Sequence, residues 1–188
     1  MRRTLRKELA LLLIAGILGS AAPGRAAGVA EPAGYRMEEY KAPVPDSLEG
    51  ATVVTTEQAE ALWRKKETVF IDVMPNAPKP ANLPAGTIWK DKVRKGIPGS
   101  IWLANVGYGD LSDETASYFR RGLADITGGN RSRAVLFYCM TNCWMSWNAA
   151  KRAMEWGYRS VAWYPLGSDG WESAGHPLEE LRPYTGGN

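Results

Sequence analysis

The sequence predicts an α/β fold of three layers, in which helices flank a central and mainly parallel sheet. Residues 134–138, AVLFY, form an apolar run without polar alternation, which is typical of a strand buried on both faces. In residues 146–156 the apolar positions recur every three or four residues, which indicates a helix. Residues 51–73 show the order strand, helix, strand, which implies a right-handed parallel unit. A chain of 188 residues that is 45% hydrophobic can build one ordinary core.

The first half of the predicted domain begins with a short strand at residues 51–54. Thr55 and Gln58 then have the spacing of a capping box, which predicts a helix that runs to Lys66. Residues 68–73, TVFIDV, are rich in β-branched and aromatic residues and predict the second strand.

The second half contains two further helices, each with a stop signal. Ser112 is the expected N-cap of a helix that reaches about Ile126, where a Gly-Gly pair follows. Gly157 is the expected end of the helix after the cysteines, in the left-handed conformation. Residues 161–164 predict the last strand, and residues 167–175 predict a turn around a tryptophan.

Residues 74–98 show no periodic pattern and contain five prolines. A long segment without regular structure is uncommon in a compact domain and is often functional. Because it follows the strand at residues 68–73, we expect it to emerge at the same edge of the sheet as Cys139. The sequence IPGS at residues 97–100 then opens a strand through residues 101–103.

Charged residues gather near the end of this segment, with Lys90, Lys92, Arg94 and Lys95 among them. One interpretation is a solvated surface. The other is that these cations lie near the thiols, with Lys92 and Arg94 supporting the site. Asp72, at the end of its strand, is a further candidate to contact the site, or it caps the turn.

The chain divides into four predicted parts. Residues 1–26 have a basic start, a short apolar stretch and small residues before a cleavage point, which predicts a signal peptide and a periplasmic location. Residues 27–50 are rich in Pro and Gly and predict an N-terminal arm. Residues 51–182 form the predicted domain, and residues 183–188 form a C-terminal tail.

The charge of the chain changes when the predicted signal peptide is removed. Residues 1–26 hold five of the 23 Lys and Arg and one of the 20 Asp and Glu. The remaining chain therefore has 18 basic and 19 acidic residues, a net charge of −1. Such a balance does not call for nucleic acid or a membrane surface as a partner.

The two cysteines of the sequence, Cys139 and Cys143, flank the turn between the buried strand and its helix. Backbone N–H groups and a helix N-terminus at such a turn favour an anion, and a thiolate is an anion. We therefore expect a nucleophilic Cys139, with Cys143 as its helper. The alternative is a structural disulfide, which would constrain little chain because three residues separate its ends.

Metal and histidine chemistry have little support in the sequence. His176 is the single histidine and is far from the cysteines in sequence, which disfavours a Cys-His pair. Structural zinc needs four N or S ligands, more than the Cys and His of one chain supply. Cys139, Cys143 and the neighbouring Met140 and Met145 could bind Cu(I), but packing is the favoured role of these methionines. We predict no metal and no cofactor.

Five stretches together resemble a rhodanese domain, in the right order. They are FID at residues 70–72, IPGSIWL at 97–103, AVLFYC at 134–139, WGYRSV at 156–161 and LGSDGWESAGHP at 166–177. The segments GYRMEEYKAPVP and CWMSWNAAKR resemble, more closely, exported rhodanese-like proteins with a CxxxCW motif that are associated with pyrroloquinoline-quinone (PQQ)-dependent catabolism. The resemblance implies a rhodanese-like fold over residues 51–182.

By this resemblance, Cys139 is the sulfur-carrying nucleophile, and the amides of the following loop cradle its persulfide. That loop comprises Met140, Thr141, Asn142, Cys143 and Trp144. Typical active loops have basic residues where this chain has Met140 and Trp144, so thiosulfate should bind less well. The related phosphatases need an arginine where this chain has Met145, which makes phosphatase activity unfavoured.

Three functions follow from the sequence as alternatives. The leading one is a sulfurtransferase that handles sulfane sulfur through a persulfide on Cys139, with a small sulfur donor and a thiol acceptor. The second is a thiol-disulfide redox protein that uses Cys139 and Cys143. The third is a non-catalytic partner of a periplasmic PQQ-dependent dehydrogenase system, which rests on the family association.

Overall fold

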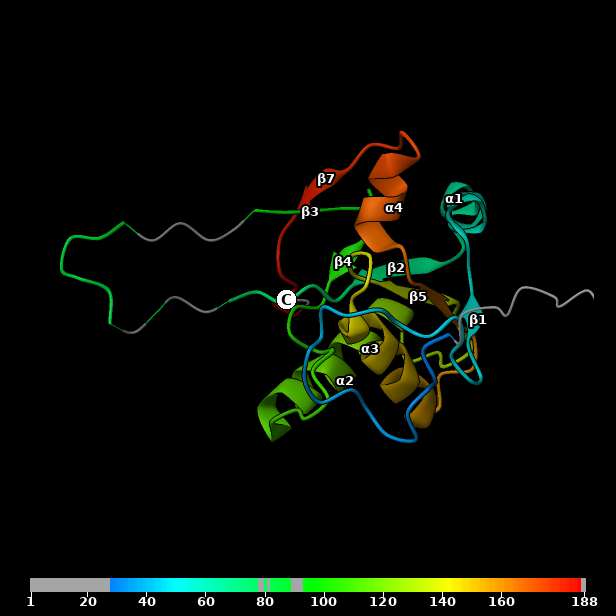
Figure 1. Ribbon diagram of the computed structural model, residues 1–188, viewed down its shortest axis with the longest axis horizontal. Helices are drawn as coiled ribbons and strands as arrows, with labels where there is room; N and C mark the ends of the chain where they lie inside the picture. The colour runs from blue at the N-terminus through cyan, green and yellow to red at the C-terminus, as the bar shows by residue number, and fades with distance from the viewer. Residues whose placement is uncertain (1–27, 78–79, 81, 89–92, 187–188) are drawn as a thin grey trace, which may run out of the picture.

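The computed structural model describes residues 28–77, 80, 82–88 and 93–186, and the predicted signal peptide lies outside these residues. Within them, five strands form one parallel sheet in the order β1-β6-β5-β2-β4 (Figure 1). The strands are β1 (Thr52–Val53), β2 (Val69–Asp72), β4 (Ile101–Trp102), β5 (Val135–Tyr138) and β6 (Val161–Tyr164). The prediction of a central parallel sheet is confirmed.

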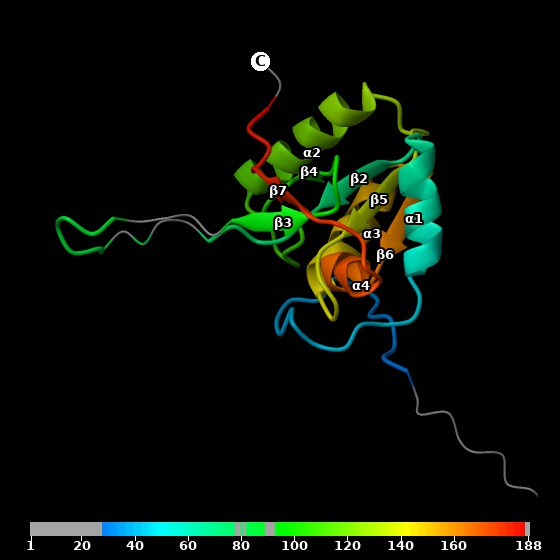
Figure 2. The same cartoon turned by 90° about the horizontal axis from the view of Figure 1, so that it is seen from above.

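Helices cover both faces of the sheet, so the predicted three layers are also confirmed. The helices α2 (Asp113–Thr127) and α3 (Trp144–Glu155) lie on one face, and α1 (Thr56–Lys65) and α4 (Gly167–Ser173) lie on the other (Figures 1 and 2). Alternate residues of β5 point to opposite layers: Phe137 packs in the larger core cluster with α2 and α3, while Tyr138 packs in the cluster that includes α1 and α4.

The sequence signals at the helix ends act as expected. Thr55 and Gln58 form the capping box of α1, in which the side chain of each accepts a hydrogen bond from the backbone N–H of the other. The side chain of Ser112 accepts from the N–H of Thr115 at the start of α2. Gly157 adopts a positive φ of 91° after α3, a conformation that glycine tolerates best.

Two expectations about the second half of the chain were wrong. The helix after the cysteines begins at Trp144, earlier than residue 146, because Cys143 already acts as its N-cap residue. Residues 167–173 form α4 instead of an open turn. Its two glycines lower helix propensity and hid this helix from sequence patterns. They are needed for packing, because a Cβ at Gly170 would lie 2.8 Å from the Tyr164 hydroxyl.

A second, antiparallel sheet joins distant parts of the chain. Its strands are β3 (Arg94–Gly96) and β7 (Glu179–Leu181). We expected residues 74–98 to lack regular structure, and β3 corrects that expectation at their end. Strand β3 could not be predicted from apolar alternation, because its sequence is RKG. The pairing with β7 is a tertiary contact that brings Arg94 to the end of β2.

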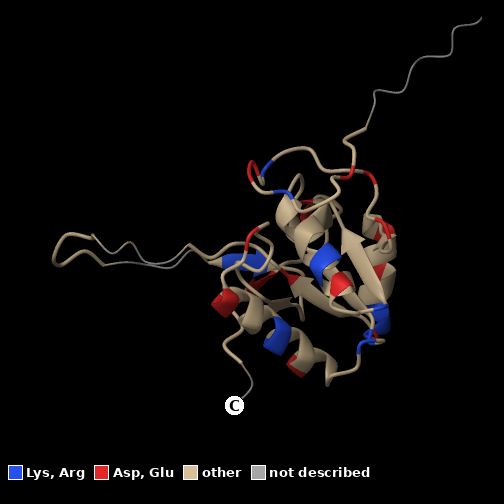
Figure 3. Cartoon of the chain, turned by 90° about the horizontal axis from the view of Figure 1, so that it is seen from below, with Lys and Arg blue, Asp and Glu red and all other residues tan. Residues whose placement is uncertain are grey.

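The N-terminal arm, residues 28–50, runs along the N-terminal part of α3 with little regular structure of its own (Figure 1). Its backbone makes hydrogen bonds to side chains of α3, which are described below. Acidic and basic residues are interspersed over the described elements (Figure 3). No described helix has the length and apolar character needed to cross a membrane.

Candidate active site

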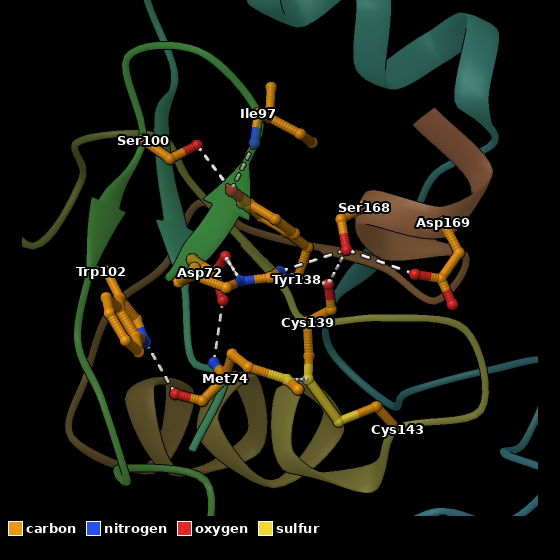
Figure 4. A network of polar contacts seen from close by, with 11 residues as sticks. Asp72, Met74, Ile97, Ser100, Trp102, Tyr138, Cys139, Cys143, Ser168 and Asp169 are labelled. Atoms are coloured by element: carbon orange, nitrogen blue, oxygen red, sulfur yellow. Dashed lines mark hydrogen bonds and ion pairs between the residues drawn. A yellow bond between two sulfur atoms is a disulfide. The ribbon is translucent and has the colours of Figure 1, made fainter. Parts of the chain in front are cut away.

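The two cysteines meet at the carboxyl end of β5. Cys139 directly follows this strand and has no exposed surface, and Cys143, with 6% of its surface exposed, precedes α3. Their sulfur atoms form a disulfide, and their Cα atoms are 6.2 Å apart (Figure 4). Asn142 turns the loop between them with a positive φ of 57°. The structure therefore brings the predicted nucleophile and its predicted helper into direct contact.

A buried ion pair holds the backbone of Cys139. Arg94 Nε lies 2.6 Å from Asp72 Oδ2, and the Asp72 side chain is fully buried. Arg94 Nη2 donates to the carbonyl oxygen of Cys139 at 3.0 Å and to Ser168 Oγ at 3.2 Å. The backbone N–H and the hydroxyl of Ser168 also donate to the same carbonyl, each at 3.1 Å. Arg94 of β3 and two groups of Ser168 in α4 thus hold the carbonyl of Cys139, directly after the end of β5.

This network bears on whether the cations of residues 74–98 form a solvated surface or lie near the thiols. Arg94 lies at the site and Asp72 contacts it, as one interpretation proposed, but Arg94 binds the carbonyl of Cys139 instead of facing its sulfur. Lys95 lines the cleft described below. Lys90 and Lys92 lie outside the described residues.

Burial and charge act in opposite directions on Asp72. Burial raises the pKa of its carboxyl to about 6, although Arg94 and the N–H of Met74, which donates to Oδ1 at 2.8 Å, both favour the ionised form. Burial, with a smaller effect of Asp72, also raises the pKa of Tyr138 well above its ordinary value. The Tyr138 hydroxyl accepts from the N–H of Ile97 at 2.9 Å and donates to Ser100 Oγ at 2.9 Å (Figure 4).

The loop between the cysteines is less open to an anion than we expected. The N–H of Thr141 donates to Asp169 Oδ2 at 3.3 Å, and the N–H of Trp144 donates to the carbonyl of Tyr40 at 2.9 Å. Two of the amides that the resemblance implied for a persulfide cradle are therefore already bonded. Their partners come from α4 and from the arm, which sequence patterns in the loop do not show.

The arm covers the Cys143 side of the disulfide, and sequence reasoning did not assign it this role. Lys41 pairs with Cys143 in an isolated antiparallel bridge, and its ammonium lies 3.3 Å from the sulfur of Met140. The indole N–H of Trp144 donates to the carbonyl of Pro43 at 3.1 Å. Trp144, which we expected in the active loop, is therefore buried beneath the arm.

Asn148, on the next turn of α3, anchors the arm. Its side-chain oxygen accepts from the N–H of Arg36, and its amide nitrogen donates to the carbonyls of Arg36 and Gly107, all at 2.9 Å. The Asn148 side chain is fully buried, so these bonds cannot be exchanged for water without opening the contact. The sequence signal that pointed to this part of the arm was the segment GYRMEEYKAPVP, on which the closer family resemblance rests.

A cleft of about 520 Å³ opens beside Cys139. Apolar residues, two cations and two acids line it: Met74, Pro75, Asn76, Ala77, Val93, Arg94, Lys95, Trp102, Tyr108, Ser168, Asp169, Glu172 and Leu178. The sulfur of Met74 lies 3.4 Å from the sulfur of Cys139, so this methionine separates the disulfide from the cleft (Figure 4). The cleft lies at the carboxyl edge of the parallel sheet, where ligands bind in open α/β folds.

The structure places the single histidine, His176, away from the cysteines. His176 stacks near Trp171, with ring centroids 4.6 Å apart, and its Nε2 lies 3.7 Å from Glu60, so its contacts are away from the cysteines. Within the described ranges, no three His, Cys, Asp or Glu side chains come together as a metal site. Both cysteines are used in the disulfide.

Several solved structures are similar to this chain. A thiosulfate sulfurtransferase from Pseudomonas aeruginosa has 18% identity and a TM-score of 0.48, over 71% of this chain and 21% of its own. A polysulfide-sulfur transferase homodimer from Wolinella succinogenes has 17% identity and a TM-score of 0.44, over 72% and 82%. A protein of unknown function from Rhodopseudomonas palustris, a possible tyrosine phosphatase, has 22% identity and a TM-score of 0.43, over 69% and 85%.

The chain thus spans about a fifth of the length of the first of these structures. No protein-family model and no curated protein matches the sequence. Likeness at this level does not carry an activity from one protein to another, so function has to be argued from the cysteines and their surroundings.

Proposed function

We propose that the protein handles sulfane sulfur as a persulfide on Cys139, which Cys143 then resolves. The observation that carries this proposal is the direct contact of the two sulfur atoms at the carboxyl end of β5, beside a cleft. A cysteine that is followed by a second thiol within bonding reach can form an intermediate and then resolve it.

The reaction begins from the reduced pair. With thiosulfate as donor, the Cys139 thiolate attacks the outer sulfur, the S–S bond of thiosulfate breaks, and sulfite leaves. The Cys143 thiolate then attacks the Cys139 sulfur of the persulfide, and hydrogen sulfide leaves as its anion. The two cysteines lose two electrons and become the disulfide, while the sulfane sulfur gains the same two electrons. Two external thiols then reduce this disulfide by exchange through a mixed disulfide: they restore the Cys139 and Cys143 thiols and are themselves oxidised to a disulfide.

One observation also favours the alternative of a thiol-disulfide redox protein, because the structure contains the disulfide itself. In that case the pair exchanges electrons with another dithiol, and sulfane sulfur has no part in the cycle. The two functions differ in whether Cys139 ever gains an additional sulfur atom.

The proposed location is the periplasm, and the proposed partner is a PQQ-dependent dehydrogenase system. The first rests on the signal-peptide pattern of residues 1–26, and the second on the resemblance to CxxxCW proteins. N-terminal sequencing of the exported protein should find a start near Ala27. An intact Met1 on protein retained in the cytoplasm would contradict the location.

Intact-mass measurement of the reduced protein with thiosulfate or polysulfide tests the function. Cys143→Ser should accumulate one additional sulfur atom, because the resolving thiol is gone, while Cys139→Ser should gain none. The unsubstituted protein should return to the disulfide mass and release hydrogen sulfide. If no form gains sulfur and both variants only lose the disulfide, the redox alternative holds and the persulfide proposal is wrong.

A further inference from the structure

Three sulfur atoms lie together at the site, and only two of them belong to cysteines. Met74 Sδ is 3.4 Å from Cys139 Sγ, which is bonded to Cys143 Sγ (Figure 4). Met74 follows β2 and the cysteines flank the loop after β5, so the cluster depends on the pairing of these two strands. It is not visible in the spacing of the sequence.

The backbone of Met74 is held from both sides. Its N–H donates to Asp72 Oδ1 at 2.8 Å, and its carbonyl accepts from the indole N–H of Trp102 at 2.7 Å. These bonds fix the backbone of Met74 at the end of β2, and from this position its thioether reaches Cys139.

The other methionines near the cysteines in sequence are placed differently. The sulfur of Met140 lies 3.3 Å from the ammonium of Lys41. Met145, in the first turn of α3, is buried in the larger core cluster. If a soft-metal site exists here, its third ligand is Met74, which the sequence spacing did not suggest.

We propose that reduced Cys139 and Cys143, together with Met74, bind one Cu(I) ion. Thiolate and thioether sulfur are the soft ligands that Cu(I) prefers, and the structure supplies three of them, with Cys139 Sγ in contact with the sulfur atoms of both Cys143 and Met74. Zn²⁺ is disfavoured, because its sites use four ligands and no His, Asp or Glu completes this cluster in the described part of the chain.

Binding requires reduction of the disulfide by a dithiol reductant, which is itself oxidised to a disulfide by the two electrons transferred. Cu(I) then replaces two protons: two Cys S–H bonds break, two Cu–thiolate bonds and one Cu–thioether bond to Met74 form, and two protons are released to solvent. The ion would approach through the cleft of about 520 Å³, which Met74 lines, and the Met74 side chain would move aside to admit it to the cysteines. The opposite side of the cluster, at Cys143, is covered by the arm.

Competition with a chromophoric Cu(I) chelator, under anaerobic conditions and with prereduced protein, tests the proposal. The protein should withdraw one equivalent of Cu(I) from the chelator. Met74→Leu, which keeps the size of the side chain, should weaken binding roughly tenfold or more, as expected when a metal site loses one supporting group. Met154→Leu, in the last turn of α3 and away from the cysteines at its start, is the matched control and should leave the affinity unchanged.

X-ray absorption of the copper-loaded protein supplies the second measurement. Three sulfur ligands are expected in the unsubstituted protein and two in Met74→Leu, and circular dichroism should show that both variants fold. The absence of stoichiometric uptake would overturn the proposal. Two sulfur ligands in the unsubstituted protein, or an unchanged affinity in Met74→Leu, would also overturn it. Sulfur loading by thiosulfate is measured without copper, so either result stands independently of the persulfide chemistry.

Discussion

Cys139 and Cys143 share one disulfide, but different parts of the molecule hold them. Cys139 is held by a buried charged network, in which Arg94 joins Asp72 to the Cys139 carbonyl. Cys143 is covered by the arm, through the bridge to Lys41 and neighbouring backbone hydrogen bonds. The first region consists of strand ends in the core, whereas the second is a segment with almost no regular structure.

This difference separates two properties of the site. Charges in the network respond to pH, and removing one partner is costly, because the fully buried Asp72 has no water to replace a lost partner. The arm contributes fewer charges at the cysteines and instead controls how reagents reach Cys143. The following variants change one region while leaving the other as an internal reference.

The largest effect is expected from Arg94→Met, which leaves the carboxylate of Asp72 buried without its cation. Breaking a buried ion pair on one side costs about 3–5 kcal/mol, so the free energy of unfolding in urea should fall by that amount at neutral pH. The double variant with Asp72→Asn should recover much of the loss, because no charge then remains to be compensated. Equal stability of the single and double variants would contradict the role of the pair.

The second-largest expected effect is a pH dependence of the free energy of unfolding, caused by Asp72. Its pKa is about 6 in the folded protein against an ordinary value of 3.8, so the folded state takes up the proton more readily than the unfolded state. The contribution of Asp72 to stability is therefore present below pH 4 and is lost as the pH rises through 6, by at most roughly 3 kcal/mol.

Urea unfolding of the unsubstituted protein and Asp72→Asn, measured from pH 4 to pH 7, checks this prediction. The other carboxyl groups are common to both proteins, so the difference between the two curves isolates Asp72. The difference should change with pH from about 4 to 7 and level off at the top of this range, because the folded-state pKa is about 6. A constant difference over the whole range would show that Asp72 does not titrate there.

A smaller loss of stability is expected from Asn148→Leu, which changes the arm. The backbone N–H and carbonyl of Arg36 lose their partners, which costs about 1–3 kcal/mol for buried groups. In the reduced protein, iodoacetamide should modify Cys143 faster than before, because the arm no longer covers it. The rate at Cys139, read from the same peptide digest, is the reference and should not change.

Much of the fold could be predicted because its signals are local. The capping box at Thr55, the N-cap at Ser112 and the uninterrupted apolar run of β5 are properties of neighbouring residues, and each element lies where these signals place it. The position of Cys139 at the end of a buried strand followed from the same pattern. Four residues of β5 are fully buried, as an apolar run without polar alternation predicts.

The missed features depend on contacts between distant residues. Helix α4 has too many glycines for a helical pattern, and β3 has no apolar alternation. Arg94 could be suspected only as one cation among several, since nothing in a charge run tells which side chain turns inward. The sequence of the arm shows no periodic pattern. The arm is held in place by hydrogen bonds from Asn148 and Trp144 of α3.

By itself, the sequence determined the α/β layers and the place of the two cysteines at a strand end and a helix start, because hydrophobic periodicity and capping act within one or two turns of chain. Only the tertiary structure decided that Met74, Arg94 and the arm surround those cysteines. Their contacts join residues separated by 45 to 112 positions. Such contacts arise when the strands pair and the helices pack, and no local pattern encodes them.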